Sequence, residues 1–419
     1  MLPVAPAGGS DLGPVLLGLA VILVLAKTGG VLVERLGQSA VLGELMAGVV
    51  IGNLQYFGLV ELRFLRDQPV LDVLAEFGII LLLFEVGIEW TVPQMLRVGW
   101  AALLIAVVGI VVPAVLGWGA ATLFLGGESG YAHLFVGAIL CATSVGVTAR
   151  VLRDLGKTRT PEARLILGAA VMDDVLGLVV LAAVSAMIQA ASGGASLGPN
   201  QVILIVVKAG GFLVGAILVG RWLAPRMFRV AARVPGRGVL LPLSLSFCFL
   251  LAYLSQLAGL APIIGAFTAG LILDSVEFAH LTTREERSLE ELLHPVTSLF
   301  LPVFFLLMGL KVDLRVFGEP EILGFAAVLT VAAIAGKMAC AAAVWGGVID
   351  RWVVALGMIP RGEVGLIFAG IGLTLLVEGR PVVSVPAYSA VVIMVMVTTL
   401  VTPLLLRWRY ASARHSPGG

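Results

Sequence analysis

Long apolar runs, separated by short polar stretches, cover almost the whole chain. A helix of about 20 apolar residues spans the hydrocarbon core of a bilayer, and runs of this length are too long for buried strands. Thirteen helical segments are therefore expected, at residues 12–33, 39–57, 70–89, 98–126, 132–152, 162–190, 201–225, 238–257, 259–277, 290–310, 318–346, 351–377 and 385–407. The predicted fold class is an all-α polytopic membrane protein with about thirteen transmembrane helices.

The composition agrees with this class. Hydrophobic residues make up 59% of the chain and charged residues 13%, and the mean hydropathy is +1.07, so a soluble globule with a polar surface is excluded. The three cysteines, Cys141, Cys248 and Cys340, lie inside apolar segments without metal-ligand spacing, which argues against a disulfide framework or a zinc site. The four histidines are scattered, so nothing favours an enzyme, and no nucleic-acid partner or cofactor is expected.

The distribution of basic residues predicts the orientation. Loops and flanks after odd-numbered segments hold nineteen Lys and Arg, whereas those after even-numbered segments hold five. The positive-inside rule then places the N-terminus outside and the C-terminus in the cytoplasm. The expected location is the bacterial inner (cell) membrane.

Two adjacent carboxylates, Asp173 and Asp174, lie in the middle of the segment at 162–190. A charge at that depth costs about 2.5 to 3.5 kcal/mol on insertion scales, so such residues are first considered functional. Lys337 lies equally deep in the segment at 318–346, and a carboxylate partner would keep it charged. Neighbouring residues on a helix point about 100° apart, so one aspartate can pair with Lys337 while the other faces an aqueous cavity. A static structural salt bridge is the alternative, and it leaves the second aspartate unexplained.

The chain also contains an internal repeat. Gly43 and Gly265, Gly48 and Gly270, and Gly87 and Gly309 are each separated by 222 residues in similar local sequences, and a looser match relates Gly146 to Gly365 at 219. Segments one to six would then match segments eight to thirteen. Because matching segments are seven helices apart, the six-helix repeats would be inverted, as in many secondary transporters. The alternative is chance recurrence of small residues in glycine-rich helices.

Two segments at matching places in the repeat are predicted to be broken. Thr143 and Ser144 lie in one, and Pro360 and Gly362 in the other. Because Pro removes a backbone donor and Gly tolerates irregular dihedrals, freed carbonyls and the two hydroxyls would offer oxygen ligands to a small cation. The alternative is a kinked helix satisfied by its neighbours. Arg361 and Glu363 are expected to form a structural ion-pair network at the break, and Asp72 and Glu76 to be local ion-pair partners or entrance groups.

Together these motifs carry a family resemblance that covers nearly the whole chain. The stretches at 38–49, 143–152, 168–181, 260–267, 336–337 and 360–365 resemble the monovalent cation:proton antiporters of the second cation/proton antiporter group, especially the NapA-type sodium/proton antiporters. The resemblance implies a homodimer with two parts per protomer. A dimerisation domain would comprise 1–97 and 238–317, and an ion-transport core 98–200 and 318–410, joined by a linker helix at 201–237. The core would move like an elevator.

The resemblance also implies roles for the site residues. Asp174 matches the carboxylate that binds the cation or the proton, Asp173 matches the carboxylate paired with the lysine, here Lys337, and Thr143 and Ser144 fall in the crossing-helix region. Asp173 and Asp174 are thus the expected monovalent-cation ligands.

The predicted function is secondary active exchange of sodium or lithium for protons, expected to be electrogenic because Lys337 would release a further proton. The partners are monovalent cations, protons, the lipid bilayer and a second copy of the chain. Potassium/proton antiport is the first alternative, although those relatives more often replace the first carboxylate by an uncharged residue. A passive channel and a sodium-coupled organic-anion symporter are further alternatives, and both leave the carboxylate and lysine pattern unexplained.

Overall fold

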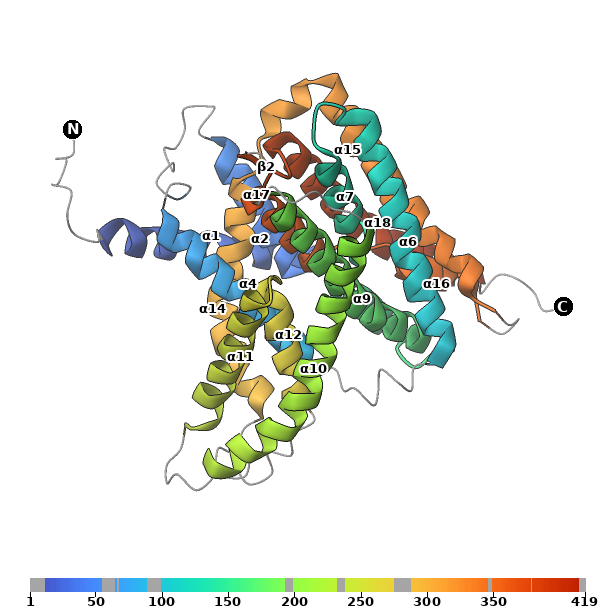
Figure 1. Ribbon diagram of the computed structural model, residues 1–419. Coiled ribbons are helices and arrows are strands. Elements are labelled where there is room, and N and C mark those ends of the chain that lie inside the picture. The colour runs from blue at the N-terminus through green and yellow to red at the C-terminus, as the bar shows by residue number, and fades with distance from the viewer. Residues whose placement is uncertain are drawn as a thin grey trace, which may run out of the picture. The chain divides into compact units, whose positions relative to one another are not determined.

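The structure is a computed structural model that is helical along most of its length (Figure 1). It describes residues 12–54, 65, 68–88, 99–192, 199–231, 238–274, 288–345, 349–377 and 379–413. Seven helices in this part of the chain are long and apolar enough to cross a membrane. With the shorter apolar helices beside them, they identify a multi-pass membrane protein.

The observed helices follow the predicted segments closely. Those of the first half are α1 (Leu12–Glu34), α2 (Ala40–Leu54), α4 (Pro69–Ile88), α6 (Gly99–Phe124), α7 (Gly130–Ile139), α8 (Val145–Asp154) and α9 (Pro161–Ser192). The others are α10 (Pro199–Ala231), α11 (Leu240–Leu257), α12 (Pro262–Asp274), α14 (Leu289–Leu310), α15 (Pro320–Met338), α16 (Arg351–Gly357), α17 (Glu363–Thr374) and α18 (Val385–Ala413). Two short 3₁₀ helices, Leu314–Gly318 and Ala339–Ala343, flank α15.

Two helices run further than predicted. The apolar pattern ends α10 at 225 and α18 at 407, whereas the structure continues them to Ala231 and Ala413. The added turns contain three arginines, Arg226, Arg229 and Arg409. Hydropathy marks where a helix leaves the hydrocarbon, but arginine is a good helix former, so the helix itself continues.

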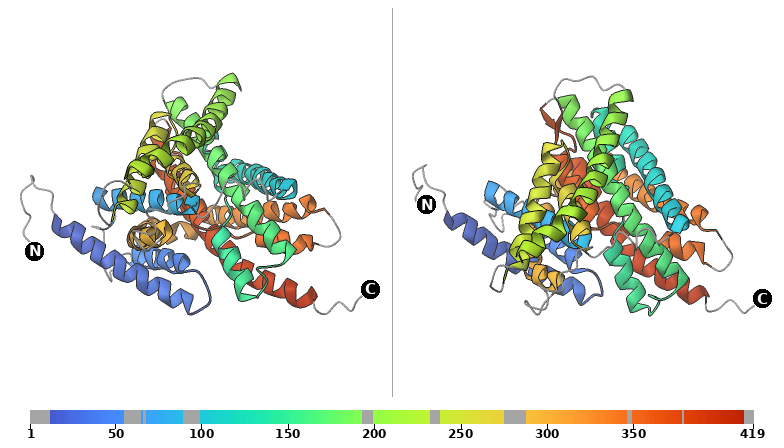
Figure 2. Two further views of the ribbon diagram at one scale, coloured as in Figure 1. Left: turned by 90° about the horizontal axis from the view of Figure 1, so that it is seen from below. Right: turned by 60° about the horizontal axis from the view of Figure 1, so that its bottom comes forward.

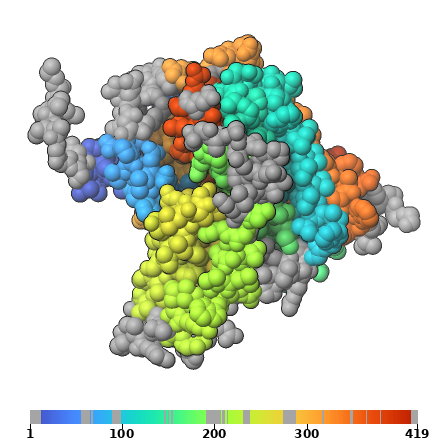
Figure 3. Space-filling model, in the orientation of Figure 1, coloured from blue at the N-terminus to red at the C-terminus, as the bar shows by residue number. Residues whose placement is uncertain are grey.

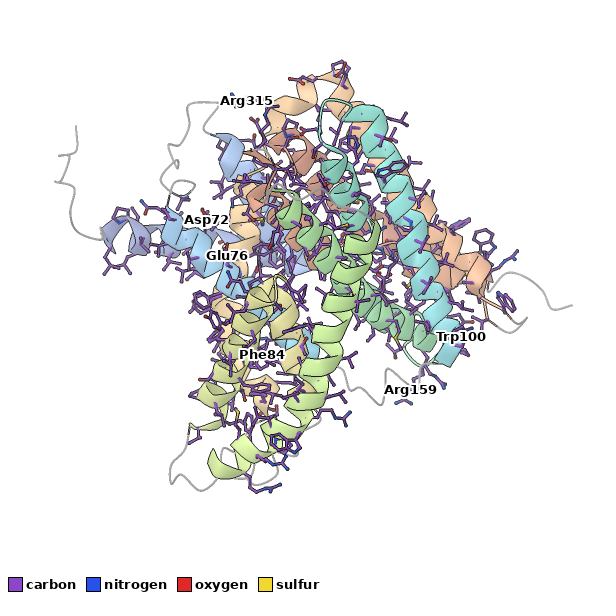
Figure 4. The ribbon with its side chains drawn as sticks, in the orientation of Figure 1. Asp72, Glu76, Phe84, Trp100, Arg159 and Arg315 are labelled. Atoms are coloured by element: carbon purple, nitrogen blue, oxygen red, sulfur yellow. The ribbon has the colours of Figure 1, made fainter. Side chains whose placement is uncertain are left out.

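The helices form two compact units. The first unit comprises α1, α2, the part of α4 up to Gly78 and the part of α14 from Thr297, and the second unit comprises the remaining helices. In the first unit, Lys311 pairs with Asp72 at 3.0 Å, which confirms Asp72 as a local ion-pair partner. Figure 4 shows Glu76 close to Asp72 on α4.

Glycines allow helices of the first unit to approach each other closely. A Cβ at Gly43 would overlap the backbone of Gly29, where α2 meets α1. A Cβ at Gly48 would likewise overlap Leu306 O and lie 2.9 Å from Gly309 Cα, where α2 meets α14. Small residues are the usual means of close helix packing in membranes.

The second unit contains two apolar clusters. One joins the end of α4 to α10, α11, α12 and the start of α14, and it includes a close approach of Gly87 on α4 to Gly270 on α12. The other joins α6, α9, α16 and α18 through residues such as Ile105, Ile166 and Leu406. α10 runs beside α9 and also contacts α12 (Figures 1 and 2).

Both predicted helix breaks are present in the second unit. The first segment divides into α7 and α8 around residues 140–144, and the second into α16 and α17 around residues 358–362. Ser129 and Asp350 cap α7 and α16 by accepting hydrogen bonds from backbone N–H groups of the first turn. The second segment was predicted to extend to 377, but α17 ends at Thr374, and a two-stranded hairpin pairs Leu376 with Pro381.

Candidate functional site

The site is built around the middle of α9, within the second unit. Asp173 is completely buried, and Asp174, the next residue, is 9% exposed. Because successive residues on a helix point in different directions, the two carboxylates have different surroundings. Asp174 is therefore the more exposed of the two carboxylates.

Lys337 on α15 neutralises the buried partner. Its Nζ atom lies 2.9 Å from Asp173 Oδ1, and both side chains are fully buried. The same ammonium donates a hydrogen bond of 2.9 Å to Cys141 O, at the break between α7 and α8. Such a pair is stable only when its remaining hydrogen bonds are made, because both ions have lost their hydration.

A glycine on α6 makes room for this ion pair. A Cβ at Gly109 would lie 3.2 Å from Lys337 Nζ, 3.2 Å from Cys340 Sγ and 3.5 Å from Asp173 Oδ1. Gly109 was not singled out by the sequence reasoning, since one glycine in an apolar helix gives no signal of its own. The close approach to two distant charged residues is visible only in three dimensions.

The two helix breaks are bonded to each other. Ser144 N donates to Pro360 O at 2.8 Å, and Thr148 Oγ1 donates to Gly357 O at 2.6 Å. A Cβ at Gly362 would come within 2.5 Å of Ser144 Oγ, so this position needs a glycine. The chain segments around Ser144 and Gly362 therefore define one another's conformation.

Basic side chains donate hydrogen bonds to the backbone carbonyls that follow α7. Lys337 binds Cys141 O, and Arg361 Nη1 donates to Ala142 O. Positive charge at a helix C-terminus is favourable, because the unsatisfied carbonyls give that end a partial negative charge. Of the carbonyls expected to attract a cation, these two are thus already bonded to protein cations.

Arg361 is fully buried, and its side-chain hydrogen bonds within the described residues go to backbone carbonyls. Its Nη2 atom donates to Ala333 O at 3.3 Å, one turn before Lys337 on α15, and its own carbonyl accepts from Thr399 Oγ1 on α18. Its contacts in the described part of the chain tie the break to two other helices. The side chain of Glu363 lies outside the described residues, so the ion pair expected between the two stays a prediction.

Thr143 and Ser144 lie at the same break, and each is 1% exposed. Ser144 Oγ accepts a hydrogen bond of 3.5 Å from Val147 N, as an N-cap of α8 does. Within the described residues, no group of three His, Cys, Asp or Glu side chains could hold a metal ion. Two carboxylates and two hydroxyls are oxygen ligands of the kind that a monovalent cation takes. The roles predicted for these residues stay predictions.

Comparison with known proteins gives consistent matches along the chain. A family model described as "Sodium/hydrogen exchanger, transmembrane" matches residues 20–409. The high-affinity Na(+)/H(+) antiporter NhaS3 of Synechocystis is 36% identical over 96% of this chain and 91% of its own. The Na(+)/H(+)-K(+) antiporter GerN of Bacillus cereus is 33% identical over 94% of this chain and 96% of its own.

Among solved structures, the sodium proton antiporter MjNhaP1 from Methanocaldococcus jannaschii has a similar fold. The TM-score is 0.71 over 96% of this chain and 99% of that chain, at 17% sequence identity. At this identity the likeness concerns the fold alone.

Proposed function

The chain belongs to the sodium/hydrogen exchanger family, and from this premise we propose that it exchanges sodium ions for protons across a membrane. The resemblance inferred from the sequence motifs is confirmed at the level of this family, which is one of transporters. The observation that carries the proposal is the unequal pair on α9, with Asp173 buried against Lys337 and Asp174 slightly exposed.

The exchange follows from competition at Asp174. A carboxylate in a largely dry site binds either a proton or a dehydrated cation, because holding both would leave an excess positive charge in a low-dielectric interior. Thr143 and Ser144 supply hydroxyl oxygens for the cation. Loading one ion on one side then requires release of the other, which is the chemical requirement for antiport.

Lys337 couples a further proton to the exchange. A cation at Asp174 places positive charge beside the buried pair and weakens the attraction between Asp173 and Lys337, so Lys337 loses its proton. More than one proton then moves per cation, and transport is electrogenic. The support is the 2.9 Å distance within a fully buried pair, where charges interact strongly.

We further propose alternating access through two inverted repeats. Two close contacts support it, Gly48 with Gly309 and Gly87 with Gly270. Gly48 corresponds to Gly270, and Gly87 corresponds to Gly309, at the repeat offset of 222 residues. The two contacts therefore join the same two positions of the repeat, with the repeats exchanged. In a third contact, Gly78 with Phe300, the two residues correspond to each other at the same offset. Such reciprocity is the mark of a pseudo-twofold relation between repeats.

The division into moving parts follows the same proposal. Residues 1–97 and 238–317 form the dimerisation domain of a homodimer, and 98–200 and 318–410 form a core that moves as an elevator. The linker helix at 201–237 joins them, and the C-terminus lies in the cytoplasm, as the basic loops predict.

Potassium is the second candidate cation. The printed name of GerN includes potassium, and its sequence is 33% identical to this chain. The Asp173–Lys337 pair favours sodium, and lithium is expected to follow sodium because it also binds oxygen ligands.

The test is a dye assay in proteoliposomes with an imposed pH gradient. Sodium, lithium and potassium are added in turn to the full-length protein. We expect sodium and lithium to dissipate the gradient and potassium to do so weakly. A gradient that none of the cations dissipates, while current flows without proton movement, would indicate a channel instead.

A further inference from the structure

The last turns of α10 have two faces of opposite character. Ala224 and Phe228 are buried in the apolar cluster of the second unit. Four exposed residues of the same turns are here called the α10 arginine face: Arg221, Trp222, Arg226 and Arg229. Trp222 is 60% exposed despite its large apolar ring.

The arginine face is ordered by its own contacts. The guanidinium carbon of Arg226 lies 3.9 Å from the centre of the Trp222 ring, and Arg226 also donates a hydrogen bond to Trp222 O. A cation over an indole face is held by the ring quadrupole. The outer edge of the guanidinium therefore stays available to an anion.

The described residues provide no carboxylate partner for the positive charge of this face. Within the described part of the chain, no ion pair involves Arg221, Arg226 or Arg229. Three arginines within nine residues thus form a local surplus of positive charge at the end of a membrane-protein helix. A surplus of this kind favours an anionic partner.

An apolar stripe leads directly to the arginine face. Val207, Val214, Leu218 and Val219 are all exposed on α10, and Leu218 is 67% exposed. Residues of this kind face hydrocarbon in a membrane protein, and Trp and Arg mark the headgroup level beyond them. In Figure 3 the surface of α10 is open to the viewer beside that of α11.

We propose that the α10 arginine face binds the headgroup of an anionic phospholipid. The phosphate contacts the three guanidinium groups, and the acyl chains lie along the stripe at Val214 and Leu218. Both halves of one amphipathic ligand are thereby matched by a single helix face. A soluble phosphate compound matches only the arginine half.

A lipid bound at this place would contact a helix that packs against the helix carrying the site carboxylates. α10 contacts α9, which carries Asp173 and Asp174, and it also contacts α12. Holding the end of α10 therefore stabilises the packing of both helices. The proposal does not depend on which cation is transported, and binding can be measured without transport.

Native mass spectrometry of the full-length protein in detergent tests the proposal. Dioleoyl-phosphatidylglycerol and dioleoyl-phosphatidylcholine are titrated against the wild type and against the triple variant R221Q/R226Q/R229Q. Each arginine near an anionic surface contributes about fivefold in affinity. We expect the wild type to prefer phosphatidylglycerol, and the triple variant to lose at least about tenfold of that preference.

Two control variants separate the site from general effects of charge or folding. R35Q/R159Q/R164Q removes three exposed arginines elsewhere and is expected to keep the preference. R221K/R226K/R229K keeps the charge and is expected to keep most of the preference for phosphatidylglycerol. This variant keeps the proposal testable if the glutamine variant does not fold. The proposal is overturned if R35Q/R159Q/R164Q loses as much of the phosphatidylglycerol preference as R221Q/R226Q/R229Q does. It is also overturned if the preference survives in R221Q/R226Q/R229Q. Displacement of phosphatidylglycerol by millimolar inorganic phosphate overturns it as well.

Discussion

At the residue scale, the difference between two neighbouring carboxylates leads to the first prediction. Asp174 is the carboxylate that is not fully buried, and the proposed exchange needs its negative charge. We expect Asp174→Asn to abolish sodium-dependent dissipation of a pH gradient in proteoliposomes, because an amide binds neither a proton nor a sodium ion strongly. The folded state should persist, since the substitution removes a charge from an apolar helix.

The matched control is Glu321→Gln, at an exposed position near the start of α15. This change also neutralises one carboxylate, and exchange should remain close to that of the wild type. Exchange that persists in the Asp174→Asn variant at the wild-type rate would remove the basis of the proposed mechanism.

The ion pair of Asp173 and Lys337 leads to a second prediction, on stability. Removing one partner of a buried pair leaves an uncompensated charge, which costs about 3 to 5 kcal/mol in free energy of unfolding. Asp173→Asn and Lys337→Gln should each lower the thermal unfolding midpoint. The double variant should recover part of the loss, because no isolated charge remains.

The same variants separate a structural role from a transport role. If Lys337 carries a transported proton, the double variant regains stability but not voltage-driven exchange. Voltage-driven exchange in the Lys337→Gln variant would show that the lysine only stabilises the fold.

Some site residues could be predicted from the sequence because charge is conspicuous in an apolar chain. Asp173, Asp174 and Lys337 stand out for this reason. The backbone partners of the basic side chains could not be predicted in the same way, since Cys141 O, Ala142 O and Ala333 O are atoms that every residue type provides. A pattern of side chains contains no information about which carbonyl a buried arginine reaches.

At the scale of helices, the close glycine contacts lead to a third prediction. A Cβ at Gly48 or Gly270 would overlap backbone atoms of the facing helix. Backbone cannot move as a side-chain tip can, so Gly48→Ala and Gly270→Ala should each destabilise the protein by about 1 to 3 kcal/mol. Thermal unfolding in detergent measures the loss.

Helical glycines in open space provide the control for these variants. A Cβ at Gly119 or Gly177 would meet no atom within 4 Å. Because alanine is a better helix former than glycine by about 1 kcal/mol, these substitutions should be neutral or slightly stabilising. Equal losses at all four glycines would mean that close packing is not what Gly48 and Gly270 provide.

The helix breaks show what sequence determines at this scale. Pro360 and Gly362 disturb a helix by known backbone chemistry, and the cluster of hydroxyls at Thr143 and Ser144 marks the other break, so both breaks could be predicted. The hairpin at Leu376–Pro381 could not, because strands of two residues are too short to show an alternating pattern. Gly379, with a φ of +77°, adopts the left-handed conformation that a turn of this kind requires.

At the scale of the whole molecule, the orientation and the division into domains remain predictions from charge and resemblance. A positive-inside count depends on the membrane potential and the insertion machinery, neither of which is encoded in side-chain packing. The inverted repeat also stays a prediction, and the reciprocal contacts of Gly48 with Gly309 and of Gly87 with Gly270 support it. Sequence offsets alone could predict which glycines correspond, but not which ones touch.

The final prediction concerns the charge moved in each transport cycle. If Lys337 releases a proton in addition to the one exchanged at Asp174, each cycle moves one net charge, and 100 mV then contributes about 2.3 kcal/mol. That energy shifts the sodium gradient at equilibrium by about fiftyfold. Thiocyanate that leaves preloaded proteoliposomes makes their interior positive. We expect this potential to drive sodium accumulation in the wild type and not in the Lys337→Gln variant. An equilibrium gradient that is independent of the potential in the wild type would mean that one proton exchanges for one sodium ion, and that Lys337 keeps its proton throughout the cycle.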